Sequence, residues 1–512
     1  KYAYDDLGRL ILLADGEDTL IVGYDYDDAG RVTQKTLGNG VYTTYHYDGS
    51  GRLTRLSNLK PDDSLLSQFE YTYDTSGRVT SMTTAYGTGD PRISGTELYE
   101  YDALGQLTHV GFPDGRIVEY EYDEVGNRTR VVDDGVPTLY SPINNMNQYL
   151  QVGGAAYTHD DDGNMASKTE NGVTTTYTYD VENHLVQVDQ GPTGEAAVDT
   201  WIYSYDGMGN RVGMEHNGDD TSFIIDPIGF GNLAAEYDGS GNINVLYRHA
   251  YGLVSQKDES GLDSFYTFSA IGNTSDLTGP SGVVQNQYSY MPFGNNAFAD
   301  ESVITPFTFS GQWGIISGDW GLHLMRTRSY DSTLGRFTTQ DLTGLAGGSS
   351  NFYLYVYNSP LIMVDPDGTV GHIVAGFFIG GIVHSVFYAI TTEEFSYEGL
   401  GSAFISGGVS GAVTAAAPIW LAPWAVGAIA GAVENSSGYL IDCALGLRNF
   451  DYGDWAQETG EGVVFGAAAG WLSKLVAPKV LANVNFNRLQ FPEVPKQFYA
   501  MYKSIFKYIG KP

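Results

Sequence analysis

A short pattern recurs through the first half of the chain and limits its fold more than any other feature. The pattern is an aromatic residue, any residue, Tyr, Asp, two further residues, Gly, Arg or Asn, and an apolar residue. Neighbouring copies mostly lie roughly 20 to 30 residues apart, a period typical of stacked supersecondary units. Copies begin at Tyr2, Tyr24, Tyr45, Tyr71, Tyr99, Tyr120, Tyr177 and Tyr203, and degenerate copies contain His159-Asp160 and Tyr237-Asp238.

Each copy reads as one β-hairpin. Two Tyr residues separated by one position lie on the same face of a strand, because side chains alternate with a period of two. The Asp can accept backbone N–H bonds and start a turn, and the Gly supplies the positive φ that closes it. A lone hairpin is marginally stable, so neighbouring units must stack. The sequence therefore predicts a mainly β fold, an array of antiparallel hairpins, with strands throughout residues 20–290.

Composition excludes several kinds of site. The formal net charge of −34 argues against phosphate-backbone binding, so we expect no nucleic-acid partner for the repeat region. Cys443 is the only cysteine, which rules out an intrachain disulfide and a cysteine metal cluster. The nine histidines show no HExxH-type spacing. We expect neither a metal nor another cofactor.

Residues 281–369 carry a denser set of motifs. They run in the order Tyr288-Ser289-Tyr290-Met291-Pro292-Phe293-Gly294, Phe309-Ser310-Gly311-Gln312, Arg326-Thr327-Arg328-Ser329-Tyr330-Asp331, Leu334-Gly335-Arg336-Phe337, Asn351-Phe352-Tyr353-Leu354-Tyr355 and Asp365-Pro366-Asp367-Gly368. The repeats resemble the YD repeats of the RHS (rearrangement hotspot) proteins, the insecticidal toxin-complex B and C components and the teneurins. This later segment is similar to the RHS-repeat-associated core, with Met291 in place of an Asp.

The resemblance implies a β-sheet spiral rolled into a shell (residues 1–280) that encloses a polypeptide, closed by a core (residues 281–369). It implies a secreted or cell-surface protein that carries its own C-terminal effector. A secretion-system component and an immunity protein would be further partners. Because Lys1 begins inside a repeat, we expect the chain to start within a longer protein.

In many members of this family the core cuts its own chain with two aspartates. Carried over, the pair is Asp341 and Asp365 with Arg336 as support, and the cut falls between Thr369 and Val370. Two close carboxylates can divide the acid and base roles. The chain departs from the motif at Leu342, which replaces a proline, and at Thr369, which replaces a leucine. The sequence leaves open whether the pair is an autoproteolytic site or a structural turn.

The composition changes beyond the core. Residues 370–478 are rich in Gly and Ala, with small residues four apart, and predict closely packed helices. They suit either a pre-toxin segment folded in or near the shell, which we favour, or a membrane-inserting piece. Residues 479–512 read as a basic amphipathic tail that could begin an effector, and a basic helix of this kind can touch a membrane, a nucleic acid or an acidic neighbour.

Two functions remain in view. The first is encapsulation and delivery of a C-terminal effector, which requires the core and the distinct region after it. The alternative is a surface adhesion or glycan-binding protein, in which exposed Tyr rows contact sugars. We favour the first, because the alternative tolerates the core but does not need it.

Overall fold

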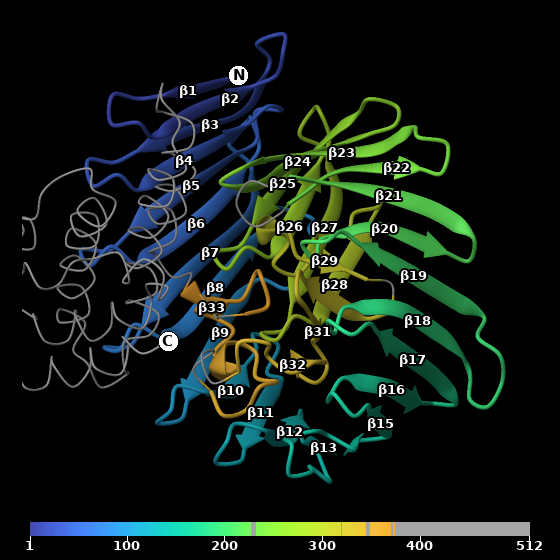
Figure 1. Ribbon diagram of the computed structural model, residues 1–512. Coiled ribbons are helices and arrows are strands. Elements are labelled where there is room, and N and C mark those ends of the chain that lie inside the picture. The colour runs from blue at the N-terminus through green and yellow to red at the C-terminus, as the bar shows by residue number, and fades with distance from the viewer. Residues whose placement is uncertain (227–231, 319, 345–348, 370–371, 374–512) are drawn as a thin grey trace, which may run out of the picture. The chain divides into compact units, whose positions relative to one another are not determined.

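The computed structural model describes residues 1–226, 232–318, 320–344, 349–369 and, for the backbone, 372–373 (Figure 1). The chain divides into two units, Lys1–Ile379 and Gly380–Pro512, and every described residue belongs to the first. The predicted helical segment 370–478 and basic tail 479–512 therefore lie outside the described residues, except for His372–Ile373.

The first half of the repeat region forms one antiparallel sheet of 13 strands, in which each strand pairs with the next along the chain. This order is that of hairpins in tandem. Its strands are β1 (Tyr2–Tyr4), β2 (Leu10–Ala14), β3 (Leu20–Tyr26), β4 (Val32–Leu37), β5 (Tyr42–Tyr47), β6 (Leu53–Leu59), β7 (Leu65–Tyr73), β8 (Val79–Tyr86), β9 (Gly95–Tyr101), β10 (Leu107–Gly111), β11 (Ile117–Tyr122), β12 (Arg128–Asp133) and β13 (Val136–Leu139).

The second half forms a sheet of 15 strands in the same sequential order. An isolated bridge between Tyr140 and Val152 continues the pairing from the end of the first sheet. The strands are β14 (Gln151–Val152), β15 (Ala155–His159), β16 (Met165–Glu170), β17 (Val173–Tyr179), β18 (Leu185–Pro192), β19 (Asp199–Tyr205), β20 (Arg211–His216), β21 (Asp219–Asp226), β22 (Asn232–Asp238), β23 (Ile243–Ala250), β24 (Gly252–Asp258), β25 (Asp263–Phe268), β26 (Thr274–Thr278), β27 (Val284–Tyr290) and β28 (Asn296–Glu301).

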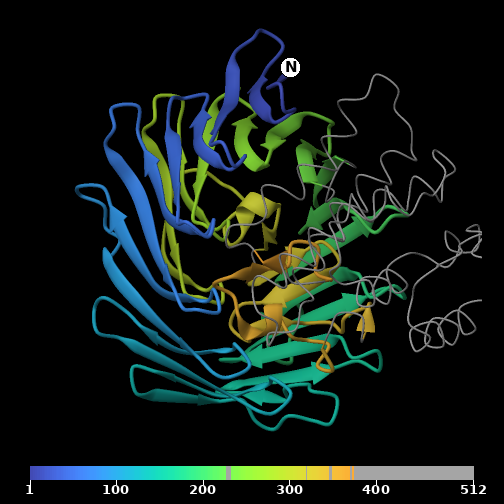
Figure 2. The same cartoon turned by 90° about the vertical axis from the view of Figure 1, so that its left-hand side faces the viewer.

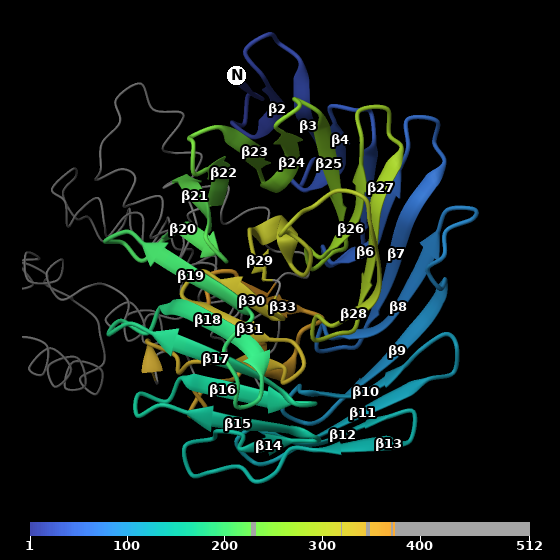
Figure 3. The same ribbon diagram turned by 90° about the vertical axis from the view of Figure 1, so that its right-hand side faces the viewer.

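The core contributes short elements that lie between the two sheets in Figures 2 and 3. One small sheet has the order β29-β30-β31-β32, and a second pairs β33 with β34. The elements are η1 (Gly311–Trp313), β29 (Ile316–Ser317), β30 (Leu322–Met325), β31 (Arg328–Asp331), β32 (Arg336–Phe337), η3 (Val356–Asn358), β33 (Met363–Val364) and β34 (His372–Ile373).

The Asp of the motif organises its own turn. In the copy that starts at Tyr71, Asp74 Oδ1 accepts the N–H groups of Ser76 at 2.8 Å and Arg78 at 2.9 Å. Its other carboxylate oxygen accepts from Arg78 Nε at 2.7 Å. Gly77 adopts a φ of 84°, a conformation that glycine reaches without steric cost. One carboxylate thus fixes the turn and the first residue of the return strand.

The Arg of each motif also links its copy to the next one. The guanidinium carbon of Arg78 lies 5.1 Å from the ring centre of Tyr101, and Arg78 Nη1 donates to the carbonyl of Asp102 at 3.1 Å. The hydroxyl of Tyr101 donates in turn to the carbonyl of Val79 at 2.8 Å. The same Arg–Tyr stacking recurs from Arg9 to Tyr26, from Arg31 to Tyr47 and from Arg52 to Tyr73. We call this repeated set of contacts the Asp–Arg–Tyr link.

Copies without the Arg keep the bond to the Asp. Gln106 Nε2 donates to Asp102 at 2.7 Å, and Asn127 Nδ2 donates to Asp123 at 2.8 Å. His184 takes the position in another copy, where its ring nitrogen lies 3.1 Å from Asp180 and its ring stacks on Tyr205 at 4.7 Å.

The two sheets meet along a polar seam. Arg92, in the loop after β8, donates to Asp276 of β26 at 2.6 Å, and both side chains are fully buried. Ser67 of β7 donates to the same carboxylate at 2.9 Å. Asn39 donates to Thr278 at 2.9 Å. A buried charge is costly without a partner. The seam therefore favours only the arrangement of the two sheets in which its polar groups, Arg92 and Asp276 above all, reach one another.

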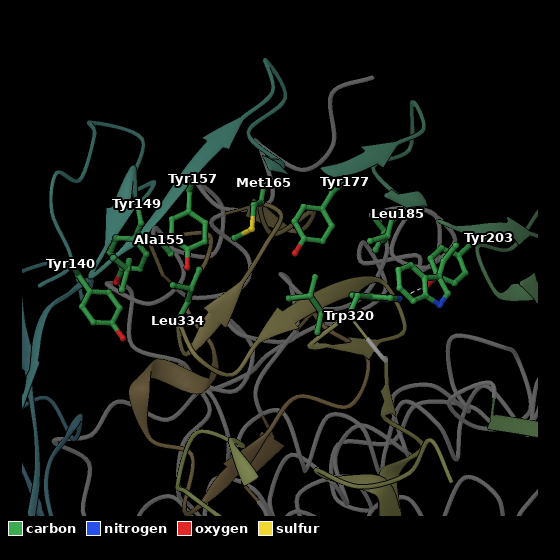
Figure 4. Packing of buried hydrophobic residues seen from close by; sticks show 14 residues of the cluster. Tyr140, Tyr149, Ala155, Tyr157, Met165, Tyr177, Leu185, Tyr203, Trp320 and Leu334 are labelled. Atoms are coloured by element: carbon green, nitrogen blue, oxygen red, sulfur yellow. Dashed lines mark hydrogen bonds between the residues drawn. The ribbon is translucent and has the colours of Figure 1, made fainter. Parts of the chain in front are cut away.

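The core packs on Tyr side chains that project from the second sheet (Figure 4). Trp320 lies edge-on to Tyr203, with ring centres 6.1 Å apart, and its indole N–H donates to the Tyr203 hydroxyl. Leu334 belongs to the same cluster. On the first sheet, Leu361 and Ile362 pack against the buried cluster that contains Tyr120. The core is therefore anchored to both sheets through their buried aromatic residues.

These observations confirm the mainly β prediction and the positive φ of the motif glycines, such as Gly30, Gly51 and Gly77. One copy has Asn183 at this position, with a φ of 63°. The adhesion alternative expects exposed rows of Tyr. The structure corrects this expectation, because motif tyrosines such as Tyr71 and Tyr99 are buried in core clusters. Within the described residues, no helix is long and apolar enough to cross a bilayer.

The Asp–Arg–Tyr link predicts a graded effect of substitutions at Arg78. Arg78→Ala removes the ion pair, the ring contact and the bond to the next copy, and should cost about 1–2 kcal/mol. Arg78→Gln should cost less, because Gln106 shows that an amide can still reach the Asp. The more exposed Arg55, 3.9 Å from Glu70, is the control, and Arg55→Ala should change stability by less than about 0.5 kcal/mol. Urea unfolding midpoints measure all three, and an equal effect of Arg78→Ala and Arg55→Ala would contradict the link.

Candidate functional site

The candidate site lies in the core, where the loop after β33 meets the start of β31. Strands β33 and β34 pair through Met363 with Ile373 and Val364 with His372, and the described part of the loop that follows β33 is residues 365–369. Residues 326–328 hold this loop, and we call them the 326–328 clamp. Arg326 Nη1 donates to Pro366 O at 2.7 Å, Thr327 Oγ1 donates to Asp367 O at 2.6 Å, and Arg328 Nε donates to Gly368 O.

The two predicted aspartates contact the same arginine. Arg328 Nη2 lies 3.3 Å from Asp365 Oδ2 and 3.4 Å from Asp341 Oδ2. The two carboxylate oxygens therefore lie no farther apart than the sum of these distances. The backbone fixes this arrangement, because Phe352 O accepts both Asp341 N–H at 3.0 Å and Arg328 Nη1 at 3.2 Å.

Burial makes the carboxyl group of Asp365 an unusually weak acid. Its side chain is 1% exposed. Burial raises its pKa to about 7, against a pull in the opposite direction from Arg328 and a further push from the neighbouring carboxylate of Asp367. A carboxyl group with such a pKa can hold or release a proton near neutral pH, which general acid–base chemistry requires. Burial also disfavours the charged form of Arg328 and so lowers the pKa of its guanidinium group.

Thr369 lies directly against this carboxyl group. Its backbone N–H donates to Asp365 Oδ1 at 3.0 Å and to Asp367 Oδ1 at 3.1 Å. A small cavity beside it has room for about one water molecule. Arg328, Asp341, Asp365 and Thr369 all line that cavity. Two carboxylates, a cation, a held peptide group and space for a water thus meet at one place.

The structure places Arg336 elsewhere. Its guanidinium donates to Asn127 Oδ1 at 2.6 Å and to Asn147 O at 2.5 Å, and it stacks 3.8 Å from the ring centre of Tyr149. It therefore ties the core to the turn of a repeat. Asn351 reinforces this contact by donating to Asn127 Oδ1 at 2.8 Å. The fifth predicted residue, Val370, lies outside the described residues.

Sequence reasoning missed the parts of the site that depend on tertiary contact. Arg328 stood within a recognised motif, but nothing in its spacing assigns it to Asp341 or Asp365. Asp367 was read as a turn residue, and its bonds to Thr369 became apparent only from the structure. An Asp two residues before a Thr was the available local signal, because such an Asp commonly accepts from that residue.

The acidity of Asp365 predicts how Asp365→Asn changes stability with pH. The folded-state pKa, about 7, exceeds the ordinary value of 3.8, so the stability that Asp365 contributes is fully present below about pH 4. It is lost as the pH rises through 7. An Asn is never charged, so the variant should gain stability relative to the wild type between about pH 4 and 8. Thermal midpoints across this range measure the trend.

Asp74→Asn provides the matched control with the opposite sign. Although burial acts in the other direction, the hydrogen bonds from Arg78 lower the pKa of Asp74. Its stabilising effect is therefore present above the ordinary pKa and lost as the pH falls below it. The Asn variant should lose stability relative to the wild type as the pH rises through about 4. Parallel trends for the two variants would refute the assigned acidity of Asp365.

Comparison with known proteins agrees with this fold. Residues 57–359 match the family model of the teneurin YD-shell, and residues 26–60 match that of the RHS repeat. The tRNA3(Ser)-specific nuclease WapA of Bacillus spizizenii is 29% identical over 379 residues, which are 72% of this chain and 15% of WapA. The probable deoxyribonuclease RhsA of Dickeya dadantii is 28% identical over 405 residues, which are 70% of this chain and 25% of RhsA.

A crystal structure of TcdB2-TccC3-TEV has the same fold, with a TM-score of 0.60 at 21% identity over 72% of this chain and 20% of that one. The chain thus spans a quarter or less of the length of each of these relatives. Because the YD-shell model covers more than half of the sequence, this chain belongs to the teneurin YD-shell family.

Proposed function

We propose that this chain is the closing part of an encapsulating shell that carries its own C-terminal segment as an effector and detaches it covalently from the shell by self-cleavage. The observation that carries the proposal is the position of the core. It is anchored to the repeats of the first sheet through Asn358 and to the second sheet through Trp320. It holds Thr369, at the end of the described residues of the loop, beside the carboxyl groups of Asp341 and Asp365.

The relatives support a carrier of this kind. WapA and RhsA are named as nucleases, and TccC3 occurs in a structure titled as a Tc holotoxin pore, so the same repeats accompany toxic activities in other proteins. The nature of the effector in this chain is left open by its sequence. A secreted or cell-surface location, an immunity protein, a secretion-system component and membrane contact by residues 370–512 belong to this proposal.

The adhesion alternative receives less support. It requires Tyr rows that face outward, whereas motif tyrosines such as Tyr71, Tyr99 and Tyr177 are buried and Tyr2 is an exposed exception. Their hydroxyls are also engaged with neighbouring copies, as Tyr73 is with Leu53 O and Tyr101 with Val79 O. These rings are therefore not free to stack on a sugar.

The proposed chemistry assigns a role to each carboxyl group. One carboxylate takes a proton from the attacking water while the other gives a proton to the leaving amine. Asp365, with its pKa near 7, suits the donor role, and Asp341 then acts as the base. Arg328 holds the two side chains together and faces the negative charge that develops. The resemblance places the cut after Thr369.

A denaturing gel of the purified chain tests self-cleavage. The wild type should give two bands, and Asp341→Asn and Asp365→Asn should each give one, because each removes one partner of the acid–base pair. Asp28→Asn, on an exposed turn of a repeat, is the matched control and should be cut like the wild type. If the Asp365→Asn variant is still cut, the two carboxyl groups are not the acid–base pair of the reaction.

Protection from an added protease tests the carrier role separately. If the shell encloses the C-terminal segment, residues 374–512 of the native protein should resist proteinase K at least about as well as the YD sheets do. They should become sensitive when urea opens the fold. Rapid loss of this segment from a native, intact shell would contradict encapsulation, whatever the gel shows.

A further inference from the structure

Thr369 is held as a nucleophile would be. Its hydroxyl donates to Asp367 Oδ1 at 2.8 Å, and the same oxygen accepts the Thr369 N–H at 3.1 Å. Asp367 is thus placed to take the hydroxyl proton. A Thr hydroxyl becomes a useful nucleophile when an adjacent base can remove its proton.

The carbonyl just before Thr369 is held as an electrophile would be. Gly368 O accepts from Arg328 Nε, a charged donor that can stabilise negative charge on this oxygen. Gly368 has a φ of 73°, and a Cβ at this position would lie 2.5 Å from Met325 O, so the backbone is pressed against the 326–328 clamp. The two preceding carbonyls are clamped as well. The Gly368–Thr369 peptide group is therefore fixed on both sides.

We propose that the chain is cut between Gly368 and Thr369 by the hydroxyl of Thr369 itself, through an ester intermediate. This inference rests on the proposed self-cleavage and moves it one bond toward the N-terminus. Attack by Oγ1 on the carbonyl carbon of Gly368 closes a five-membered ring. The reacting atoms belong to adjacent residues, so no diffusional encounter is needed.

The step balances without any reagent except water. The Oγ1–C bond forms, the hydroxyl proton passes to Asp367, and the oxyanion faces Arg328. The C–N bond then breaks, and the nitrogen of Thr369 takes a proton from Asp365, whose Oδ1 already lies 3.0 Å away. Water from the adjoining cavity, which Asp341 lines, hydrolyses the ester, and Asp341 takes the proton of that water. The products are a carboxylate at Gly368 and a free amine at Thr369.

Ordinary turns elsewhere in the chain provide the comparison. Ser64 donates its hydroxyl to Asp62 at 2.6 Å, and Thr343 donates its hydroxyl to Asp341 at 2.5 Å. Within the described residues, however, the carbonyls before Ser64 and Thr343 accept no bond from a side chain. The Asp–hydroxyl contact alone is thus a common turn feature. The arginine on the preceding carbonyl distinguishes Thr369.

The test is the N-terminal residue of the released fragment, read by mass spectrometry in the full-length chain. The inference predicts Thr369 as that residue. Thr369→Ser keeps the hydroxyl and should be cut at the same bond, whereas Thr369→Val keeps the shape and should stay whole. Asp367→Asn should slow the cut by about 100-fold or more. Hydroxylamine should speed it in the wild type and leave a hydroxamate on Gly368, which only an ester or similar intermediate gives.

A fragment that begins at Val370, or a Thr369→Val chain that is cut as fast as the wild type, overturns this inference and leaves the aspartate-catalysed cut in place. A wild-type chain that stays whole, even with hydroxylamine, overturns both kinds of cleavage. The carrier role is then decided by the protease protection alone. Equal thermal midpoints for Thr369→Val and the wild type show that a whole chain is not a misfolded one.

Discussion

The repeats depend on one contact, the motif Asp that closes its own turn, and in the first sheet this contact extends into the Asp–Arg–Tyr link. A single carboxylate closes each turn and pairs with the Arg that follows, and this Arg then lies on a Tyr of the next copy. The Tyr hydroxyl returns a bond to the first copy. No hairpin is stable alone, and in the 13-stranded sheet the link joins these marginal units to one another. In the 15-stranded sheet an Asn or a His replaces the Arg and keeps the bond to the Asp, as Asn164 and His184 do.

The link also prepares the surface on which the core docks. Where Gln106 and Asn127 replace the Arg, the side chain still bonds to its Asp but leaves an amide oxygen available. The core uses both oxygens, since Asn358 donates to Gln106 at 2.9 Å and Arg336 and Asn351 donate to Asn127. The replacement of Arg by Gln106 and Asn127 therefore helps the core to dock on the repeats. The docked core in turn holds the loop that contains Asp365 against the 326–328 clamp.

Local features of the fold were predictable, and long-range ones were not. The turns at Gly30 and Gly77 follow from residues that are adjacent in sequence, so their positive φ values were expected. The direction of the Tyr rows depends on which face the core covers, and the motif alone does not specify this. Arg336 is five residues from Asp341, yet its strand turns it toward Asn127, more than 200 residues away in sequence. Arg328 is farther from Asp341 in sequence than Arg336 is, but it reaches both carboxylates, because β31 and the loop after β33 meet in space.

The central claim is that the core closes a shell that retains the C-terminal segment after the chain is cut. Size-exclusion chromatography of the purified, cut protein tests it most directly, with each fraction identified by mass. The account predicts that both pieces elute together as one species in native buffer and separate only when urea unfolds the YD sheets. A C-terminal piece that elutes alone from a folded, intact shell in native buffer would contradict it.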